Sequence, residues 1–582
     1  MKKVYNTDIS IKDLEKEVEL YGWVAKKRNL GGLIFIDLRD NTGIVQLVFN
    51  PEFKDYDAAS NLKNEYVIRV KGSVSKRESA NERLKTGEIE VIVSELEVLN
   101  TSEEIPFVLT DDTTALEDTR LKYRYLDLRR NRLKKNILLR SEILHFLRNK
   151  MYDLGFNEIQ TPILTASSPE GARDFVVPSR VYPGKFYALP QAPQIYKELL
   201  MVGGFDKYFQ IAPCFRDEDP RADRTLEFYQ LDLEMSFVTQ DDILEVGEEI
   251  FYDTFTKFSN KKVSPRPFRR IAYKDAIDKY GTDKPDLRYS MEIQDISRIF
   301  KNTEFQVFKN VLDEGGIINA IVASNAADKY SRKDLDKLTD LVKSKKASGL
   351  AYLKFNEEVT GSIKKVVTDE EINKLKELLN IKDNDLVLIV SGNYKTTKNA
   401  LGALRIEVAN NLDIIDKDRL ELCIINDFPM FEVDEKTGKL EFCHNPFSMP
   451  HGGIKDYDKE NKEDILAYQF DFVCNGNEMA SGAIRNHDLD SLAKGFEIVG
   501  YNREEVEERF KSIFTAFKYG CPPHGGMAPG IDRLIMLIQD EANLREVQAF
   551  PPNASGQDLM MGSPSYLTKE QLEELGLSIN KD

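Results

Sequence analysis

The segment LAYQFDFVCNGNEMASGAIR, residues 466–485, constrains the fold more than any other part of the chain. Its centre is Asn475-Gly476, the strongest short signal for a β-hairpin turn. If this dipeptide forms the turn, Val473 pairs with Glu478, and Asp471 lies diagonally across from Glu478 at roughly 7–8 Å between backbones. Two carboxylates at that separation can hold Mg²⁺ together with substrate phosphates. The segment therefore predicts an antiparallel hairpin that carries a magnesium site.

Arg485 ends the same segment, seven residues after Glu478. A regular pleat puts side chains seven positions apart on opposite faces. Arg485 therefore reaches the face of the two carboxylates only if Ser481-Gly482 forms a bulge or the strand ends there. Glycine inside a strand is a common marker of a bulge, so we expect Arg485 on that face.

A second hairpin is expected at residues 207–237, KYFQIAPCFRDEDPRADRTLEFYQLDLEMSF, where two long strand segments bracket a charged loop. Polar residues alternate with apolar ones on both segments, which predicts a sheet whose one face lines a site. The positions on that face are Gln210, Arg216, Glu218, Phe228, Gln230 and Asp232. The planar fork of Arg216 suits a phosphate or a carboxylate, although a structural salt bridge is an open alternative.

The segment HGGMAPGIDRLIMLI, residues 524–538, begins with a Gly- and Ala-rich turn and continues as an apolar helix. Arg533 lies between Ile531 and Leu534 in this helix. A charge is rarely buried unpaired, so we expect an anionic ligand or a carboxylate beside Arg533. The glycines allow close backbone approach, and a helix N-terminus favours a phosphate nearby.

The chain needs several domains, because single hydrophobic cores stop growing at roughly 250–300 residues and this chain has 582. Its first part holds five short strand-like runs separated mostly by Gly or Asn, which predicts a small barrel such as an OB-fold. The runs are 18–24, 33–38, 44–49, 66–74 and 88–98. Residues 286–420 combine Lys- and Asp-rich amphipathic helices with small-residue strands, so we expect an inserted domain there.

One face of the predicted barrel has polar positions. In LIFIDL the pleat separates the apolar Ile34 and Ile36 from Phe35 and its neighbour Asp37. A single-stranded base can stack on Phe35, although core packing is an alternative for an isolated phenylalanine. Gln46 and Glu90 also lie at polar positions of their strands. These side chains predict a surface that reads unpaired bases.

The net charge of −17 argues against nonspecific nucleic-acid binding, which depends on clustered Lys and Arg. A local basic run does extend from Arg120 to Arg140, and it faces either phosphates or, as part of a helix, solvent.

No run of about 18 apolar residues occurs, so no membrane span is expected. The N-terminus lacks the apolar stretch of a secretory signal, which predicts a cytoplasmic location. The five cysteines form no C-x-x-C pair and no closely spaced Cys/His set. We therefore expect neither a zinc site nor disulfide bonds.

Together these segments resemble the three signature motifs of class II aminoacyl-tRNA synthetases. The matching stretches are GFNEIQTPILTASSPEGARDF (155–175), FRDEDPRADRTLEF (215–228) and GMAPGIDRL (526–534). With QAPQIYKELL (191–200), they are similar to the bacterial-type aspartyl-tRNA synthetases of subclass IIb. The resemblance covers nearly the whole chain and implies a ligase that activates L-aspartate with ATP and transfers it to tRNA-Asp, with tRNA-Asn as an open alternative.

The resemblance implies a multidomain α+β fold: an OB-fold barrel, a catalytic antiparallel sheet with helices, and an inserted α+β domain. The expected parts are an anticodon-binding barrel at 1–105, a hinge at 106–135, a catalytic domain at 136–285 and 421–545, an inserted GAD-type domain at 286–420, and a C-terminal extension at 546–582. The helix expected at 137–152 has apolar residues on more than one side, and in this family it lies at a two-fold interface. We therefore expect a homodimer with Pro162 near the interface.

The resemblance also implies residue roles. The expected catalytic residues are Arg216, Glu218 and Arg533. Aspartate is expected at Glu170, Gln194, Lys197, Arg216, Asp232, His444 and Arg485. ATP is expected at Arg216, Asp217, Glu218, Phe228, Glu478, Gly530, Ile531, Asp532 and Arg533. Mg²⁺ is expected at Asp471 and Glu478, and the anticodon at Leu30, Phe35, Gln46 and Glu90.

Some positions depart from the family pattern. Thr225 stands where a glutamine is common, and Asn445 where many relatives have a second histidine. Leu30, expected in the loop before the second barrel strand, stands where relatives that charge both tRNA-Asp and tRNA-Asn often carry a histidine. Leucine there points to discrimination between the two tRNAs, and packing at the barrel end is an alternative. A silent tRNA-binding paralogue and an amide synthase without tRNA are the rival functions.

Overall fold

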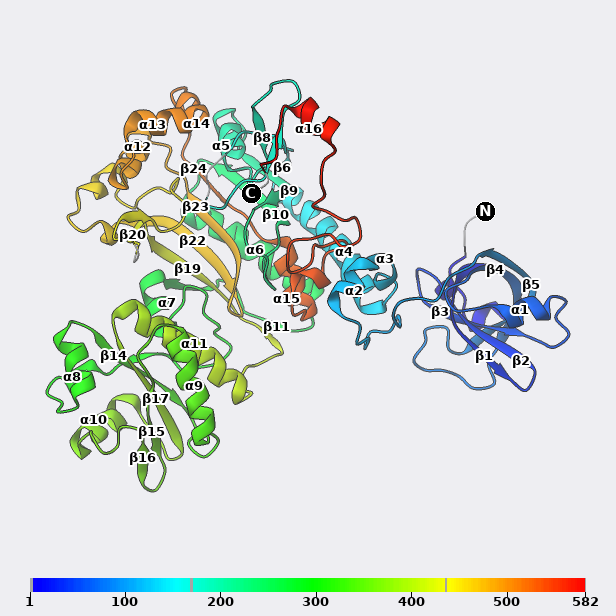
Figure 1. The fold of residues 1–582 in the computed structure, drawn as a ribbon, viewed down its shortest axis with the longest axis horizontal. Helices are drawn as coiled ribbons and strands as arrows, with labels where there is room; N and C mark the ends of the chain where they lie inside the picture. Colours follow the sequence, from blue (N-terminus) through cyan, green and yellow to red (C-terminus); the bar gives the residue numbers. More distant parts are fainter. Residues whose placement is uncertain (1–3, 168–170, 435–436, 581–582) are drawn as a thin grey trace. The chain divides into compact units, whose positions relative to one another are not determined.

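The computed structural model describes residues 4–167, 171–434 and 437–580 (Figure 1). The chain forms two compact units, residues 1–115 and 116–582, and each has its own hydrophobic core. Among the described residues no helix combines the length and apolar composition that crossing a membrane requires.

The first unit is a closed barrel in the strand order β1-β2-β3-β5-β4. Its elements are β1 Glu17–Leu30, β2 Leu33–Arg39, β3 Ile44–Phe49, α1 Tyr56–Asn61, β4 Val67–Lys76 and β5 Ile89–Asn100. All five predicted strands are present. Ile34 and Ile36 are fully buried while Phe35 between them is only partly buried, so the predicted alternation is confirmed. β1 continues past a register shift at Val24 instead of ending there.

The second unit is built on an eight-stranded sheet in the order β12-β19-β22-β23-β24-β10-β9-β6. The strands are β6 Asn157–Glu158, β9 Lys207–Phe215, β10 Glu227–Ser236, β12 Arg269–Ala272, β19 Leu422–Pro429, β22 Leu466–Cys474, β23 Asn477–Ile484 and β24 His524–Met527. The central pairings are antiparallel, as expected. The two edge strands β6 and β12 pair in parallel, so the sheet as a whole is mixed.

One face of this sheet packs on helices. Leu231 and Leu233 of β10 join a core with Ile143 of α4, Phe251 of α6 and Ile535 of α15. The helices that accompany the eight-stranded sheet are α4 Asn131–Asp153, α5 Gln194–Val202, α6 Gln240–Phe258, α7 Tyr273–Tyr280, α12 Leu489–Ile498, α13 Arg503–Arg509, α14 Lys511–Phe517 and α15 Ile531–Gln539. The alternate residues of the strands point to the opposite face, which is polar.

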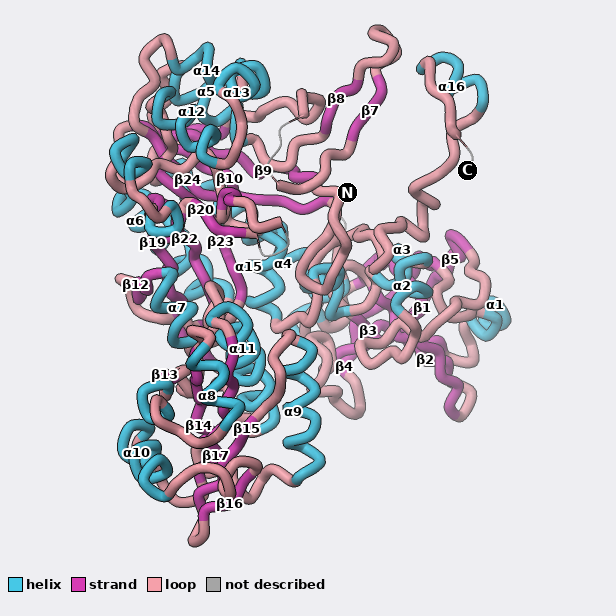
Figure 2. Tube along the Cα trace, turned by 60° about the vertical axis from the view of Figure 1, so that its left-hand side comes forward, coloured by secondary structure: helices cyan, strands magenta, loops and turns pink. Residues whose placement is uncertain are grey.

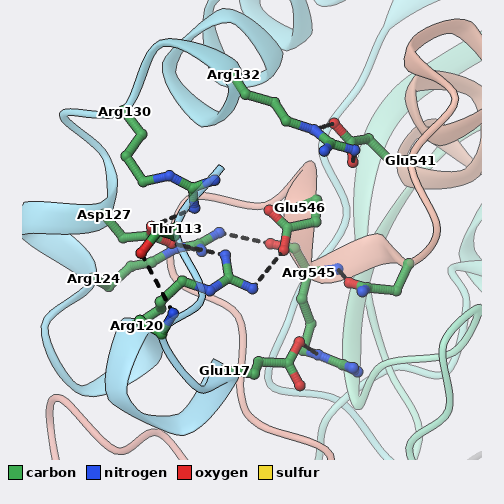
Figure 3. A network of polar contacts seen from close by, with 12 residues as sticks. Thr113, Glu117, Arg120, Arg124, Asp127, Arg130, Arg132, Glu541, Arg545 and Glu546 are labelled. Carbon is green, nitrogen blue, oxygen red and sulfur yellow. Dashed lines mark hydrogen bonds and ion pairs between the residues drawn. The ribbon is translucent and has the colours of Figure 1, made fainter. Parts of the chain in front are cut away.

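α4 begins six residues before the helix predicted at 137–152. Its first turns lie in the basic run, and the arginines there are paired internally (Figure 3). Asp127 accepts from Arg124 at 2.9 Å and Arg130 at 2.7 Å, and Arg120 bonds Glu546 at 3.0 Å. Further along, Arg132 pairs with Glu541 and Arg140 with Asp532. Both expectations were therefore wrong for Arg120, Arg124, Arg130 and Arg140, because their guanidinium groups pair with carboxylates of the protein and are mostly buried. The side chain of Arg132 is still 52% exposed, as the helix-face alternative predicted.

A second, five-stranded sheet interrupts the first, in the order β13-β14-β17-β15-β16. Its elements are β13 Gln294–Asp295, α8 Gln306–Asp313, β14 Ile317–Ala323, α9 Arg332–Ser344, β15 Ala351–Phe355, β16 Val359–Gly361, α10 Asp369–Leu379, β17 Asp385–Gly392 and α11 Tyr394–Asn411. One face packs on α9 and α11 and the other on α8 and α10 (Figure 2). α11 also contacts α7, which packs on β19 of the eight-stranded sheet.

The remaining elements are short. They are α2 Glu117–Lys122, α3 Arg124–Asp127, β7 Val176–Pro178, β8 Phe186–Ala188, β11 Lys262–Val263, β18 Arg419–Leu420, β20 Phe431–Val433, β21 Leu440–Phe442 and α16 Lys569–Leu575.

Candidate active site

The β22–β23 hairpin has the predicted turn and the predicted register at its tip. Asn475 and Gly476 adopt positive φ angles of 51° and 79°, and Val473 pairs with Glu478. The bulge, however, was expected at Ser481-Gly482, and Gly482 pairs regularly with Phe470. The register shifts earlier, where Phe472 faces Ala480, so Met479 is the extra residue.

This bulge puts Arg485 on the face predicted for it. Asp471 pairs with Ser481, and from there the alternation runs to Arg485, while the extra residue brings Glu478 onto the same face. Glu234 of β10 pairs with Gly526, which pairs with Ala483, so β10 contributes to that face too. The polar face predicted from the two hairpins is therefore a single surface.

Four charged side chains are buried together on this face. Arg485 donates from Nε and Nη2 to the two carboxylate oxygens of Glu234, at 2.9 and 3.1 Å. Lys197 of α5 lies 2.8 Å from Asp232 and 3.2 Å from Glu234. Each of the four is at most 2% exposed. Burial alone would raise the pKa of Glu234, but Arg485 and Lys197 lower it to about 2.

The two cations therefore stay charged without water around them, because the carboxylates balance them and fix their positions. The pair with Glu234 uses the Nε–Nη2 edge of Arg485 and does not involve Nη1. A guanidinium held by one edge can present its other edge to a ligand carboxylate. The arrangement suits a small acid whose side chain carries a negative charge.

A further ion pair extends this cluster. Gln194 donates to Glu198 at 2.5 Å, and Glu198 lies 3.1 Å from Nε2 of His524. The other ring nitrogen of His524 lies 2.8 Å from the carbonyl oxygen of Pro522. Both ring nitrogens thus face acceptors, which requires the doubly protonated imidazolium. Burial would lower the pKa of His524, but hydrogen bonds to Cys521 and Glu198 raise it to about 10.

Sequence reasoning missed Glu234, Glu198 and His524. Two of them carry a simple signal: Glu234 follows Asp232 by two positions on the same strand face, and Glu198 follows Gln194 by four on one helix face. Since a buried cation needs a carboxylate, the spacing of these two glutamates could have predicted them as its partners.

A pocket opens beside this cluster, where the ends of β9, β10, β23 and α15 meet. Among its lining residues are seven expected at ATP: Arg216, Glu218, Phe228, Glu478, Gly530, Asp532 and Arg533. The guanidinium of Arg216 lies over the ring of Phe228, 5.0 Å from its centre, in a cation–π contact. Glu218 pairs with Arg224 at 2.9 Å. Two cations, an aromatic face and a helix N-terminus match a nucleoside triphosphate.

Several expectations for this pocket need correction. β9 ends at Phe215, so Arg216 and Glu218 follow the strand instead of lying on its face. Arg533 is not embedded in the helix core, since its side chain is 24% exposed and it donates to the backbone carbonyl of Glu478. The helix residues around it, Ile531, Asp532 and Leu534, are buried.

Two other expected positions also differ. The backbone of Asp217 bonds Arg173 at 3.0 Å, and its side chain lines a neighbouring pocket instead of this one. His444 is exposed and packs edge-on against Phe428, with ring centres 4.8 Å apart. Glu170 lies outside the described residues.

Asp471 and Glu478 fit a hard divalent cation. Ser481 donates to Oδ1 of Asp471 at 2.6 Å, whereas Oδ2 is buried and has no hydrogen-bond partner. Burial, and next the charge of Glu478, raise the pKa of Asp471. The described residues contain no set of three His, Cys, Asp or Glu that could hold a metal. A cation here would therefore complete its shell with substrate oxygens and water.

The outer face of the barrel brings three expected residues together. Gln46 and Glu90 are neighbours on parallel strands, and Gln46 donates to Glu90 at 2.7 Å. Phe35 is two positions from Asp37, the cross-strand partner of Gln46, so it shares their face.

Leu30 lies apart from them and was expected in a loop. It is the last residue of β1, pairs with Leu33 across the Gly31-Gly32 turn and is 62% exposed. Such exposure excludes the alternative of packing at the barrel end.

The departures from the family pattern are locally satisfied. Thr225 is buried and donates to the carbonyl of Glu227 at 2.7 Å, and Asn445 accepts from the backbone of Phe447 at 2.9 Å. Thr225 also lines the nucleotide pocket.

Comparison with known proteins agrees with this geometry. Residues 116–554 match the family described as tRNA synthetases class II (D, K and N), and residues 18–99 match the OB-fold nucleic acid binding domain. Among solved structures, asparaginyl-tRNA synthetase from Pyrococcus horikoshii complexed with asparaginyl-adenylate is 20% identical, with a TM-score of 0.58 and coverage of 95% of this chain and 98% of that one. Aspartyl tRNA synthetase from Entamoeba histolytica is 19% identical, with a TM-score of 0.57 and coverage of 95% of this chain and 91% of that one. These two show the fold.

Sequence relatives are closer. A protein of Rickettsia akari (strain Hartford) named aspartate–tRNA(Asp/Asn) ligase is 49% identical over 586 residues, covering 99% of this chain and 97% of its own. A protein of the same name from Wolbachia pipientis subsp. Culex pipiens is 50% identical over 587 residues, covering 97% of each. The chain therefore belongs to the class II tRNA synthetases, and within them to the family of the aspartate–tRNA ligases.

Proposed function

We propose that the protein activates L-aspartate with ATP and transfers it to the terminal adenosine of tRNA-Asp. The single observation that carries this proposal is the buried pair of Arg485 and Lys197, held by Glu234 and Asp232 beside the pocket that Arg216, Phe228 and Arg533 line. A neutral side chain such as that of asparagine would leave the edge of Arg485 that Glu234 does not use without a carboxylate partner.

In this proposal Arg485 reads the side-chain carboxylate of aspartate through the edge that Glu234 does not use, with Lys197 next to it. Gln194 and Asp232 are buried beside Lys197 and hold the amino-acid end, and His444 and Glu170 complete the site from loops. Arg216 contacts the α-phosphate and the reacting carboxylate. Phe228 and Glu218 hold the adenine, and Arg533 the γ-phosphate.

The reaction needs no protein nucleophile. The α-carboxylate of aspartate attacks the α-phosphorus of ATP, the bond to the bridging oxygen breaks, and pyrophosphate leaves. A ribose hydroxyl of the tRNA then attacks the carbonyl carbon of aspartyl-adenylate, AMP leaves, and the hydroxyl proton is released. The task of Arg216 and Arg533 is to position the phosphates and neutralise charge, which is worth several kcal/mol in comparable sites, about 3–4 per donor.

Asp471 and Glu478 would hold Mg²⁺, whose bound form supplies charge neutralisation on the phosphate oxygens. The orphaned oxygen of Asp471 supports this assignment. Gly530, Asp532 and the backbone of Asp217 and Ile531 shape the surroundings of the triphosphate.

We propose tRNA-Asn as a second acceptor. The names of the relatives include both tRNAs, whereas Leu30 favours discrimination. Leucine cannot bond the third anticodon base, which differs between the two tRNAs, and Leu30 lies on an exposed hairpin rather than in the core. The barrel face of Phe35, Gln46 and Glu90 would contact the anticodon.

We also propose a homodimer. Three large apolar side chains are 46–53% exposed: Leu138 on α4, and Ile163 and Leu164 directly after Pro162. Exposed apolar side chains on α4 and on the segment that resembles the interface motif favour a partner of the same kind.

Aspartate-dependent exchange of pyrophosphate into ATP tests the first step, and aspartylation of tRNA tests the second. A silent paralogue would fail the first assay, and an amide synthase would pass the first and fail the second.

A further inference from the structure

A lysine beside the carboxylates proposed to hold the metal has no role in the proposed reaction. Lys284 follows α7, and its Nζ lies 3.2 Å from Oε2 of Glu478 and 3.2 Å from Asp283. Lys284 and Glu478 are each about one-third exposed, at 34% and 32% of their side-chain surface. The ammonium therefore touches one of the two carboxylates expected to hold the metal.

The position of Lys284 is explained by electrostatics. Asp471 is buried on the same face as Glu478, and two carboxylates near each other repel unless a cation is present. In the protein without nucleotide, the Lys284 ammonium supplies that positive charge. A divalent cation arriving at Glu478 must displace this ammonium or be repelled by it.

The loop that carries Lys284 is fixed over the hairpin. A Cβ added to Gly476 of the β22–β23 turn would lie 3.6 Å from Asp286 and 3.9 Å from the carbonyl oxygen of Lys284. The loop therefore packs directly on the turn that precedes Glu478.

The inserted domain holds both ends of this loop through α11 (Figure 1). At the start, Gly281 and Gly402 are so close that a Cβ on Gly402 would lie 2.7 Å from the carbonyl oxygen of Gly281. At the end, Arg405 donates to the carbonyl of Met291 at 2.7 Å, and its guanidinium lies 5.0 Å from the ring of Tyr289.

Two more bonds from α11 fasten the helix before the loop. Lys398 donates to the carbonyl of Asp278 at 2.9 Å, and the hydroxyl of Tyr394 donates to the carboxylate of Asp278 at 2.8 Å. The segment from α7 to the inserted sheet is thus tied to α11 on both sides of Lys284.

Resting on the proposed function, we infer that Lys284 is a positioning residue for the metal carboxylates: it is a resident cation that balances Glu478 until a divalent cation replaces it, and α11 of the inserted domain keeps it there. The inserted domain then sets how readily the site accepts metal. Lys284 acts through Glu478 and needs no contact with substrate.

The test is binding of Mn²⁺ to the nucleotide-free protein, followed by electron paramagnetic resonance. Removing a competing charge with Lys284→Met should tighten Mn²⁺ binding by about two- to fivefold, since a partly exposed ion pair is worth up to about 1 kcal/mol. Lys284→Arg keeps the charge and should restore the wild-type affinity. Lys274→Met removes an equal charge from the exposed side of α7 and should change little. Glu478→Gln removes the carboxylate for which Lys284 and Mn²⁺ compete, so it should change Mn²⁺ binding.

Equal or weaker Mn²⁺ binding in Lys284→Met would overturn the inference. So would Mn²⁺ binding that is the same in Glu478→Gln as in wild type. The absence of Mn²⁺ binding in all of these proteins would also overturn it. The titration contains neither aspartate nor ATP, so its outcome is independent of whether wild-type protein activates aspartate.

The role of α11 is tested by Gly402→Ala. The added methyl group must push the loop away, so Mn²⁺ should bind more tightly than to wild type. The same substitution in the Lys284→Met background should have no further effect, because the residue being positioned is gone. Additive effects would show that α11 acts on the metal site without Lys284 and would overturn this part.

Discussion

Arg485 and Glu234 form a buried ion pair with two hydrogen bonds, from Nε and Nη2 of the arginine to the two carboxylate oxygens, at 2.9 and 3.1 Å. The two residues are 251 positions apart in the chain. The pair fixes one edge of the guanidinium at the place where an aspartate side chain is proposed to bind. In the proposed function, specificity for aspartate follows from this orientation, because the substrate carboxylate would pair with the free edge of Arg485.

Arg485→Leu should abolish aspartate activation and leave ATP binding largely intact. A buried carboxylate without its cation costs about 3–5 kcal/mol, so kcat/KM for aspartate in pyrophosphate exchange should fall by more than about 100-fold. Retention of exchange within tenfold of wild type would contradict the assignment.

The double variant Arg485→Leu, Glu234→Leu is its control for folding. It removes both charges, so thermal unfolding should recover relative to Arg485→Leu, while aspartate activation should stay absent.

Glu478→Ala should weaken Mg²⁺-dependent activation at every aspartate concentration tested, because one of two metal carboxylates is lost. The Mg²⁺ concentration at half-maximal exchange should rise at least several-fold. Full activity at limiting Mg²⁺ would be incompatible with the pairing of Asp471 and Glu478.

His524 predicts a pH dependence of stability. Its pKa is raised to about 10 in the folded protein, against about 6.5 in an unfolded chain. Its contribution is therefore complete below pH of about 6.5 and is lost as the pH rises to about 10. The destabilisation caused by His524→Gln, measured by urea unfolding, should shrink across that range. A constant difference would mean that His524 is neutral.

The homodimer is tested by sedimentation. Wild type should sediment as a dimer at micromolar concentration, and Ile163→Asp should shift it to monomer, because a charge would be buried in an apolar interface. A control substitution at the exposed Val307 of α8, Val307→Asp, should leave the dimer intact. A wild-type monomer would refute the proposal.

tRNA choice is tested with unmodified transcripts. If tRNA-Asn is a second acceptor, kcat/KM for tRNA-Asp and tRNA-Asn should differ by less than about fivefold. A larger ratio would support the discrimination that Leu30 suggests, since unpaired polar groups at the third anticodon base cost about 1–3 kcal/mol.

Local patterns predicted much of the fold. Asn475-Gly476 fixed the register of Val473 with Glu478, and period-two alternation identified all five barrel strands. The predicted position of the bulge was wrong, because a glycine in a strand does not show which residue lacks a cross-strand partner. A glycine is needed at position 482 for a different reason, since the backbone of Gly526 approaches so closely that a Cβ would not fit.

Partners from distant segments could not be predicted in the same way. The basic run from Arg120 reads as a surface, but Glu541 and Glu546 neutralise much of it from more than 400 residues away (Figure 3). Lys284 carried no motif signal, and the packing of its loop on Gly476 and the contacts of α11 with both ends of that loop bring it to Glu478.

The most direct test of the central claim is aminoacylation of purified tRNA-Asp with ATP, Mg²⁺ and one amino acid at a time. Aspartate should be attached to the tRNA, whereas asparagine and lysine should be attached at least about 100-fold more slowly, because neither presents a carboxylate to Arg485. Preferential attachment of asparagine or lysine, or no attachment of aspartate, would contradict it.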